Sequence, residues 1–328
     1  MADGVRVSVV IAAYNAAESL ARAVRSVTAQ TVRDLEVVIV DDGSTDATAA
    51  VASGLAAEDG RVRLIGDGRN HGVSAARNTG FAVARGTWIA VLDADDAFAP
   101  DRLERLLAAV AEHGADMVAD NQAYWDWDAR QVTGVAIAGA ADGVERIDLE
   151  HFLANCITGR SPFDYGQLKA MIRRAFVADH RLGYIEGMRH GEDFMFYAHA
   201  LLAGAAFVRT SEPGYIYTQR VGAVSRTRSQ VARTIENNDE MRARTLELLA
   251  DPRVERTRAL AALLRRRARA IRWHASWERV YHPLHDRRFG AVLSAAARDW
   301  RVAPMLARAF AERIARRFRV GQRPQTRR

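Results

Sequence analysis

The sequence contains a single cysteine, Cys156, and a single lysine, Lys169, among its 328 residues. One cysteine excludes an intramolecular disulfide and any site built from several thiolates, and the ordinary role of a lone cysteine is that of a small buried residue. The chain has no uninterrupted apolar run of about 18 residues, and residues 1–6 lack a basic stretch followed by an apolar core. These absences predict neither a membrane-spanning helix nor a secretory signal, so we expect a cytoplasmic protein.

Charged residues are distributed unevenly along the chain, whose formal net charge is +7. Residues 1–120 contain 11 arginines and 18 acidic residues, whereas residues 251–328 contain 21 arginines and six acidic residues. The basic C-terminal region leaves a nucleic-acid binder open as an alternative class of protein. That region lacks aromatic residues regularly interleaved with base-reading groups, however, so we expect no nucleic-acid partner. The chemistry is expected in the acidic N-terminal region.

Short β-branched runs alternate with helical patterns over the first 120 residues. Strands are expected at residues 5–12, 35–40, 61–65, 88–92 and 117–119, and helices at residues 20–27, 46–57, 73–84 and from Pro100 onward. This alternation predicts an α/β fold, with a Rossmann-like and mostly parallel sheet flanked by helices.

The pattern is less regular after residue 120. The segment from Asp126 to Gly143 is rich in Gly, Ala and Asp and predicts an irregular excursion. Further elements are expected as a helix near Glu150, an amphipathic segment at residues 167–177, a helix at residues 191–204 and helices from about Thr227 onward. We therefore expect a domain over residues 1–226, with halves at 1–120 and 121–226, followed by an Arg-rich helical region at 227–328.

Polar and acidic side chains follow three of the predicted strands. They are Tyr14 and Asn15 after the first strand, Asp41 and Asp42 after the second, and Asp93, Asp95 and Asp96 after the fourth. Ligands of open parallel sheets bind at the carboxyl ends of the strands. In an extended chain Asp93 and Asp95 point to the same side, where their oxygens suit a hard dication and sugar hydroxyls. The alternative is that these acids cap the helices that follow.

Four segments resemble the family 2 inverting glycosyltransferases of the GT-A fold in sequence, order and spacing. They read VVIAAYN at 9–15, VDDGSTD at 40–46, AARN at 75–78 and DADD at 93–96. The similarity covers about residues 5–225. It extends to bacterial succinoglycan-type exopolysaccharide glucosyltransferases, particularly through residues 93–103 and 115–121.

The resemblance implies a site for a UDP-sugar, with residues 1–120 as the nucleotide-sugar half and residues 121–226 as the acceptor half. The implied donor residues are Ala12, Tyr14, Asp41, Asp42, Arg77 and Asp93, with Asp95 and Asp93 as the ligands of Mg²⁺ or Mn²⁺. Tyr14 would stack on uracil, Asp42 or Asp41 would accept a hydrogen bond from the base, and Arg77 would meet the nucleotide. Asp93 would contact the ribose or the sugar.

Two of these assignments have structural alternatives. Tyr14 could pack over the edge of the sheet, and Arg77 could form an ion pair with Asp93 or Asp95. The resemblance also covers Tyr215 to Arg226, which is similar to a mobile segment that closes over the donor. Some relatives place a metal-binding histidine there, but this chain has Gln219 and Arg220, so the second protein ligand of the metal stays open.

The motif Gly191-Glu192-Asp193-Phe194 resembles a motif of the family whose aspartate acts as the general base. Asp193 is the implied base, and Glu192 is the second candidate. Inverting transfer is one displacement at the anomeric carbon, and it needs a carboxylate to take the proton of the acceptor hydroxyl. A helix N-terminus favours the ionised carboxylate, although it also suits acids with no catalytic role.

The C-terminal residues 302–318 place apolar and arginine side chains at helical spacing. Such a helix could dock on an anionic membrane surface, which would place the protein on the inner face of the plasma membrane. The alternative is a packed helix with a solvated basic face.

The sequence therefore predicts a metal-dependent hexosyltransferase of exopolysaccharide or cell-surface glycan biosynthesis. We expect it to transfer a sugar from a UDP-sugar to a carbohydrate or lipid-linked oligosaccharide, and glucose is the favoured candidate for that sugar. The alternative is a catalytically idle nucleotide- or carbohydrate-binding module on the same fold. The presence of Asp93, Asp95 and Asp193 argues against that alternative.

Overall fold

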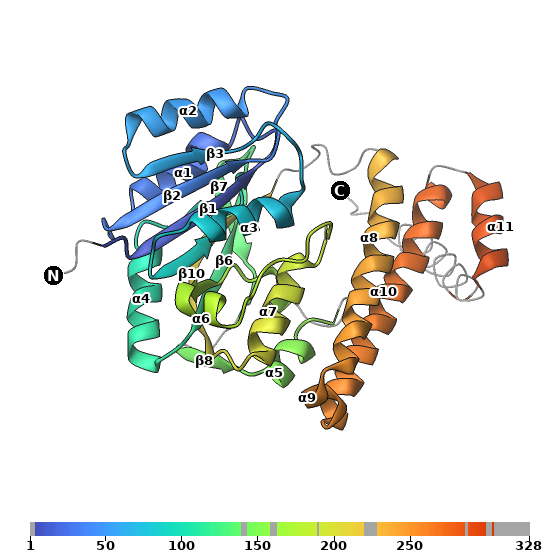
Figure 1. Cartoon of the computed structure of the whole chain (residues 1–328). Coiled ribbons are helices and arrows are strands. Elements are labelled where there is room, and N and C mark those ends of the chain that lie inside the picture. The colour runs from blue at the N-terminus through green and yellow to red at the C-terminus, as the bar shows by residue number, and fades with distance from the viewer. Residues whose placement is uncertain are drawn as a thin grey trace, which may run out of the picture.

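A mixed β-sheet forms the centre of the part of the molecule that precedes the C-terminal helices (Figure 1). The computed structural model describes residues 4–138, 143–157, 163–188, 190–219, 228–285, 288–299 and 304. Within these ranges the sheet contains ten strands, with a main order of β3-β2-β1-β4-β9-β6-β10-β5. Strand β7 pairs with β6, and β8 pairs with β10.

The elements follow in chain order. The strands are β1 (Val7–Ala13), β2 (Leu35–Asp41), β3 (Val62–Ile65), β4 (Trp88–Val91), β5 (Ala97–Phe98), β6 (Met117–Asp126), β7 (Gln131–Val135), β8 (Val144–Ile147), β9 (Met171–Arg173) and β10 (Phe207–Gln219). The helices are α1 (Leu20–Thr28), α2 (Thr48–Glu58), α3 (Val73–Val83), α4 (Arg102–His113), α5 (Leu149–Ala154), η1 (Tyr165–Gln167), α6 (Arg174–Asp179), α7 (Glu192–Leu202), α8 (Arg228–Glu247), η2 (Leu248–Ala250), α9 (Pro252–Glu255), α10 (Arg258–His285) and α11 (Phe289–Arg298).

The N-terminal part of the sheet is parallel, as the sequence predicted. Strand β1 pairs in parallel with β2 and β4, and β2 pairs in parallel with β3. The β1 and β2 side chains are almost all buried, because helices cover both faces of the sheet. Helices α1, α2 and α4 contribute to the core on one face, and α3, α5, α6 and α7 contribute to the core on the other.

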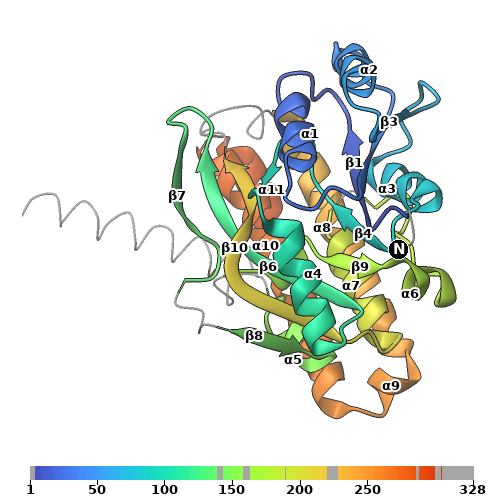
Figure 2. The same ribbon diagram turned by 90° about the vertical axis from the view of Figure 1, so that its left-hand side faces the viewer.

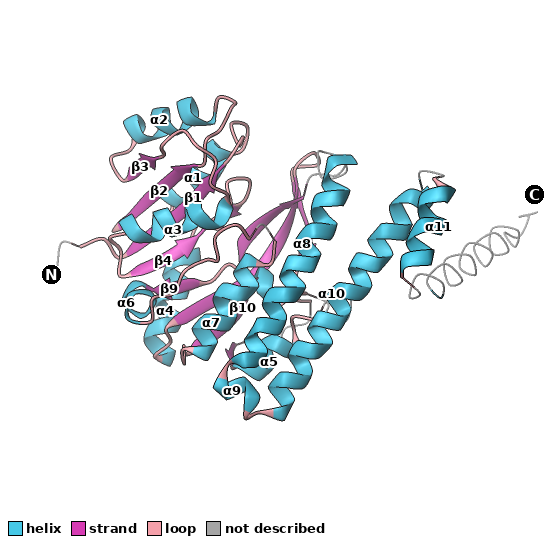
Figure 3. Ribbon diagram, turned by 45° about the vertical axis from the view of Figure 1, so that its right-hand side comes forward, coloured by secondary structure: helices cyan, strands magenta, loops and turns pink. Residues whose placement is uncertain are grey.

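The C-terminal helices extend the second of these cores. Helices α8 and α10 lie side by side, and α10 also contacts α5 (Figure 3). Buried side chains of both helices, including Met241 and Leu264, belong to the same apolar cluster as the α7 residues. No helix among the described residues is long and apolar enough to cross a membrane.

Three parts of the sheet differ from the sequence prediction. The segment expected as an irregular excursion contains β7, which pairs antiparallel with β6. The region 167–177 contains the last residue of η1, strand β9 and the start of α6. Strand β9 lies antiparallel between β4 and β6, so the sheet is mixed. Strand β10 was not predicted, because Pro213 and Gly214 are typical of a turn; register shifts around Pro213 accommodate them in a long curved strand (Figure 2).

Two predictions concern residues that the structure does not describe. The segment expected to close over the donor is described only as far as Gln219, the last residue of β10. The expected amphipathic helix at 302–318 also lies outside the described residues, apart from residue 304.

Candidate active site

The carboxyl end of β1 presents Tyr14 to solvent. The Tyr14 side chain is 52% exposed. Its neighbour Asn15 adopts a left-handed conformation (φ 51°), and the Asn15 side-chain oxygen accepts a 2.8 Å hydrogen bond from the backbone N–H of Thr45. Ala12 lies one position before the end of β1, opposite Val40 of β2. The β1 and β2 ends are thereby held together, with the Tyr14 ring accessible to a ligand.

The two acids after β2 have different surroundings. Asp42 is buried, and its carboxylate accepts hydrogen bonds from the backbone N–H groups of His71 (2.7 Å) and Gly72 (3.0 Å). Asp41 accepts a hydrogen bond from the backbone N–H of Ser44 at 3.2 Å. Asp42 therefore fixes the loop that precedes α3. A hydrogen bond donated by a nucleobase to either acid stays a prediction.

Arg77 of α3 joins the donor and acceptor halves of the predicted site. Its Nη2 lies 2.8 Å from Asp93 Oδ1, and its Nη1 lies 2.9 Å from both Asp193 Oδ1 and Glu192 Oε1. The residue is only 3% exposed. The ion pair between Arg77 and Asp93, which the sequence left as an alternative, is present. A contact between Arg77 and the nucleotide stays a prediction.

Lys169 completes this cluster, although the sequence gave no role to the only lysine. Its Nζ lies 2.9 Å from Asp93 Oδ2 and 2.8 Å from Asp193 Oδ2, and the residue is 8% exposed. Both oxygens of each carboxylate thus have a cationic partner, with Arg77 on one side and Lys169 on the other. The signal available in the sequence was a single lysine in a chain that otherwise uses arginine.

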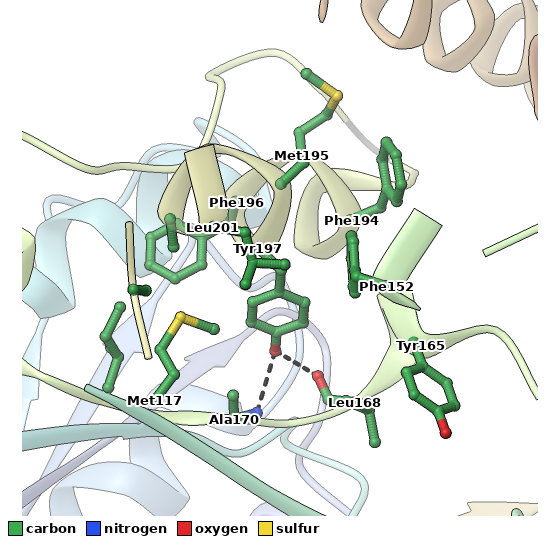
Figure 4. Packing of buried hydrophobic residues seen from close by; sticks show 14 of the residues in the cluster. Met117, Phe152, Tyr165, Leu168, Ala170, Phe194, Met195, Phe196, Tyr197 and Leu201 are labelled. Carbon is green, nitrogen blue, oxygen red and sulfur yellow. Dashed lines mark hydrogen bonds between the residues drawn. The ribbon is translucent and has the colours of Figure 1, made fainter. Parts of the chain in front are cut away.

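The backbone around Lys169 is held by Tyr197 of α7 (Figure 4). The Tyr197 hydroxyl donates to the carbonyl oxygen of Leu168 and accepts a 3.1 Å hydrogen bond from the N–H of Ala170. The residues on both sides of Lys169 are therefore tied to the helix that carries Asp193. This attachment positions the ammonium group between the two carboxylates.

The cations control the charge of the cluster. Burial opposes the ionisation of Asp93, but Lys169 and Arg77 outweigh it and hold the pKa of Asp93 well below its usual value. Burial also disfavours the Lys169 ammonium, yet Asp193 and Asp93 raise the pKa of Lys169 above its ordinary value. Asp93, Lys169 and Arg77 therefore stay charged together.

Asp96 is a further site residue whose role the sequence did not indicate. Tyr215 Oη donates a 2.6 Å hydrogen bond to Asp96 Oδ2, and the backbone N–H of Thr218 donates to Oδ1 at 2.7 Å. Burial, together with the negative charges of Asp93 and Asp95, raises the pKa of Asp96 to about 8. Tyr215 Oη also accepts a 3.2 Å hydrogen bond from the N–H of Asp93, so β10 and the loop after β4 are joined at the site.

Glu192 and Asp193 occupy the first turn of α7. Gly191 precedes them with φ 77°, a conformation that side-chain-bearing residues rarely adopt. A Cβ at this position would lie 2.7 Å from Met241 Sδ. The backbone at Gly191 thus sets the direction in which the predicted base enters the cluster.

The predicted metal ligands have unequal environments. Asp95 is exposed on the loop after β4, and its backbone carbonyl accepts a 2.8 Å hydrogen bond from Arg22. Both oxygens of Asp93 face cations instead. Within the described ranges no three His, Cys, Asp or Glu side chains cluster closely enough to hold a metal ion by themselves.

The fold and the carboxylate-lined strand ends define the GT-A class of glycosyltransferases. A crystal structure of S. aureus TarS residues 1–349 superposes with a TM-score of 0.60 at 17% identity, covering 89% of this chain and 91% of that one. The mannosyltransferase PcManGT from Pyrobaculum calidifontis, solved with GDP-Man and Mn²⁺, gives a TM-score of 0.58 at 18% identity, covering 96% and 82%. The predicted fold class is confirmed.

Residues 8–180 match the family model described as glycosyl transferase family 2, and the chain belongs to this family. The succinoglycan biosynthesis proteins ExoO and ExoU of Rhizobium meliloti are each 36% identical to it, over 220 and 221 residues. These alignments cover 67% of this chain and 62% of ExoO or 64% of ExoU. The chain thus matches less than two thirds of either relative's length, and the predicted family is confirmed.

Proposed function

We propose that the protein is an inverting glycosyltransferase that transfers glucose from UDP-glucose to a carbohydrate or lipid-linked oligosaccharide acceptor. The observation that carries the proposal is the cluster in which Arg77 and Lys169 both bridge Asp93 to Asp193. This cluster places a carboxylate of the expected donor site next to the expected general base. The names of the relatives ExoO and ExoU support an acceptor in exopolysaccharide biosynthesis.

The donor binds across the carboxyl ends of β1, β2 and β4. The exposed Tyr14 ring stacks on uracil, and Asp42 or Asp41 accepts a hydrogen bond from the base. Asp93 lies at the end of β4, where its carboxylate is in reach of the ribose or the hexose. Arg77, which holds Asp93 and Asp193, is the expected contact of the nucleotide.

The exposed carboxylate of Asp95 is the protein ligand for Mg²⁺ or Mn²⁺ in this proposal. Such ions are commonly held by one or two carboxylates together with substrate phosphates, so one exposed acid at the diphosphate suffices. A bound divalent ion supplies the charge that stabilises the leaving diphosphate. Asp93 is the second candidate ligand, and both of its oxygens also contact cations.

Asp193 accepts the proton of the attacking hydroxyl. A carboxylate has about four lone-pair sites, so Asp193 can accept an acceptor hydroxyl while it keeps its contacts with Arg77 and Lys169. The acceptor oxygen then forms its bond to the anomeric carbon as the bond to the diphosphate breaks. Neither Arg77 nor Lys169 can serve as the base while it is charged, which leaves Asp193 and Glu192 as the candidate bases.

Two variants separate the donor and acceptor roles. In Asp193→Asn the nucleotide site is intact, so we expect UDP affinity within about twofold of wild type and a loss of about 10² to 10⁴ in turnover. In Asp95→Asn we expect UDP affinity to lose its dependence on Mg²⁺. Calorimetry with UDP, with and without Mg²⁺, and a UDP-release assay measure these effects. Wild-type turnover in Asp193→Asn would move the base to Glu192, and full activity in excess chelator would refute the metal assignment.

A further inference from the structure

Three aromatic side chains lie at the carboxyl ends of β6 and β10, and the mechanism above uses none of them. Tyr124 and Tyr217 are direct neighbours in the parallel register of the two strands. Their ring centroids are 6.1 Å apart and the ring planes meet at 75°, so the two rings form a corner. Tyr217 remains 39% exposed. We call Tyr124, Trp127 and Tyr217 the aromatic rim.

Tyr217 lies directly beside the acidic loop that follows β4. Its neighbour Thr218 donates its backbone N–H to Asp96 at 2.7 Å. Burial, together with the charges of Asp96 and Asp95, raises the pKa of the Tyr217 phenol. The Tyr217 ring therefore lies close to the acidic loop after β4, although it is accessible to solvent.

Arg22 links the other end of the rim to the same loop. Its Nη2 donates to the carbonyl oxygen of Asp95 at 2.8 Å and to the Thr218 hydroxyl. Its guanidinium carbon lies 5.5 Å from the centre of the Trp127 ring. The backbone N–H of Trp127 donates to the Gln219 carbonyl at 3.0 Å. The rim is thus attached to the acidic loop at two points.

The order of the strands separates this rim from the proposed nucleotide site. Strands β1 and β2, with Tyr14, lie on one side of β4, whereas β6 and β10 lie on the other side beyond β9. The loop with Asp93, Asp95 and Asp96 follows β4 and lies between them. A ligand on the rim therefore lies beside the loop that carries Asp93, Asp95 and Asp96.

We propose that the aromatic rim is a subsite for a pyranose ring of the acceptor. This inference rests on the proposed function, because it assumes that a sugar hydroxyl is delivered to Asp193. A pyranose has an apolar face of C–H groups and a polar edge of hydroxyls. The corner formed by Tyr124 and Tyr217 offers an apolar surface, and the adjacent acids accept hydrogen bonds from hydroxyls.

The test measures binding of simple glycosides to the full chain by saturation-transfer NMR, with UDP and Mg²⁺ present. The probes are the methyl glycosides of β-D-glucopyranose, β-D-galactopyranose and α-D-mannopyranose. The variants are Tyr217→Leu and Tyr124→Leu, with Tyr217→Phe to keep the ring. Trp273→Leu is the matched control, because it removes an aromatic side chain that is 51% exposed on α10.

We expect saturation of the ring protons of at least one glycoside in the wild type. Either leucine variant should weaken this binding roughly two- to tenfold, which is the range of an aromatic contact, whereas Tyr217→Phe and Trp273→Leu should keep it. UDP affinity, measured by calorimetry, should be unchanged in all four variants. Absent saturation for all three glycosides, or equal losses in Trp273→Leu, would overturn the subsite.

Two further outcomes distinguish the subsite from the function on which it rests. A loss of UDP affinity in Tyr217→Leu would assign the ring to the donor and overturn the acceptor subsite. If the wild type bound a glycoside through the rim but did not bind UDP, the proposed function would fail while the sugar-binding site stood.

Discussion

At the residue scale, Lys169 is the buried cation that joins Asp93 to Asp193, the proposed base. Asp93 and Asp193 share the same two cations, and each carboxylate has one oxygen on Lys169 and one on Arg77. A buried ion pair is sensitive to the loss of one partner, because the remaining charge keeps its desolvation penalty. We therefore regard Lys169 as the residue that keeps the proposed base in place.

Lys169→Met removes the ammonium group and keeps a side chain of similar length. We expect the free energy of unfolding to fall by about 3–5 kcal/mol, the loss usual for breaking a buried pair. Turnover should fall by at least about tenfold. Urea denaturation and the UDP-release assay measure the two effects, and Lys169→Arg is the control that retains the charge. Wild-type turnover in Lys169→Met would exclude this role for the lysine.

At the scale of one element, α7 carries the expected base at its first turn and the main aromatic packing along its length. Phe194, Phe196 and Tyr197 are buried, and Tyr197 also fixes the backbone on both sides of Lys169 (Figure 4). Glycines with positive φ flank the helix, at Gly191 before its start and Gly204 after its end. Substitutions at these two glycines can therefore separate an effect on the position of the first turn of α7 from an effect on the stability of the protein.

Gly191→Ala should impair both stability and turnover. A left-handed alanine costs roughly 1–2 kcal/mol, and its Cβ would also meet Met241 Sδ at 2.7 Å. The first turn must then shift, and Asp193 shifts with it. Gly204→Ala is the matched control, because φ is 93° there but no atom lies within 4 Å of the added Cβ. Urea denaturation should show a loss in both variants, whereas turnover should fall only in Gly191→Ala. Equal turnover in the two variants would contradict this account.

At the scale of the whole molecule, Arg267 attaches the C-terminal helices to the catalytic domain. This α10 residue is buried, and its Nη1 donates to the Cys156 carbonyl and lies 3.3 Å from Asp164 Oδ2. Its guanidinium carbon lies 3.6 Å from the centre of the Phe194 ring, next to the expected base. The boundary at residue 226 thus separates two regions that share one core, and we propose that they unfold together.

Arg267→Met keeps much of the side-chain volume but removes these polar contacts. Hydrogen bonds that involve a charged group contribute about 1.5–3 kcal/mol each, so we expect a loss of at least that size in the free energy of unfolding. Urea denaturation followed by tryptophan fluorescence and by circular dichroism should give coincident transitions in the wild type and in the variant. Two separate transitions in the wild type would show that the C-terminal helices fold independently.

The sequence by itself determined the parts of this protein that depend on local pattern. The parallel strands, the helices between them and the acids after β2 and β4 follow from residue periodicity and from motifs of a few residues. The start of α7 at Glu192 and Asp193 was predicted for the same reason. The family followed from the spacing of these short motifs, and the family model matches residues 8–180.

Only the tertiary structure decided which of these residues meet. Arg77 and Asp193 are separated by 116 positions, and no local sequence pattern predicts that the Arg77 guanidinium contacts Asp193. Strand β10 forms despite Pro213 because long-range pairing with β6 outweighs local preference. A buried ammonium group is unfavourable unless it is paired with negative charges. Folding brings Asp93 and Asp193 into contact with Lys169, and these two ion pairs make Lys169 part of the site.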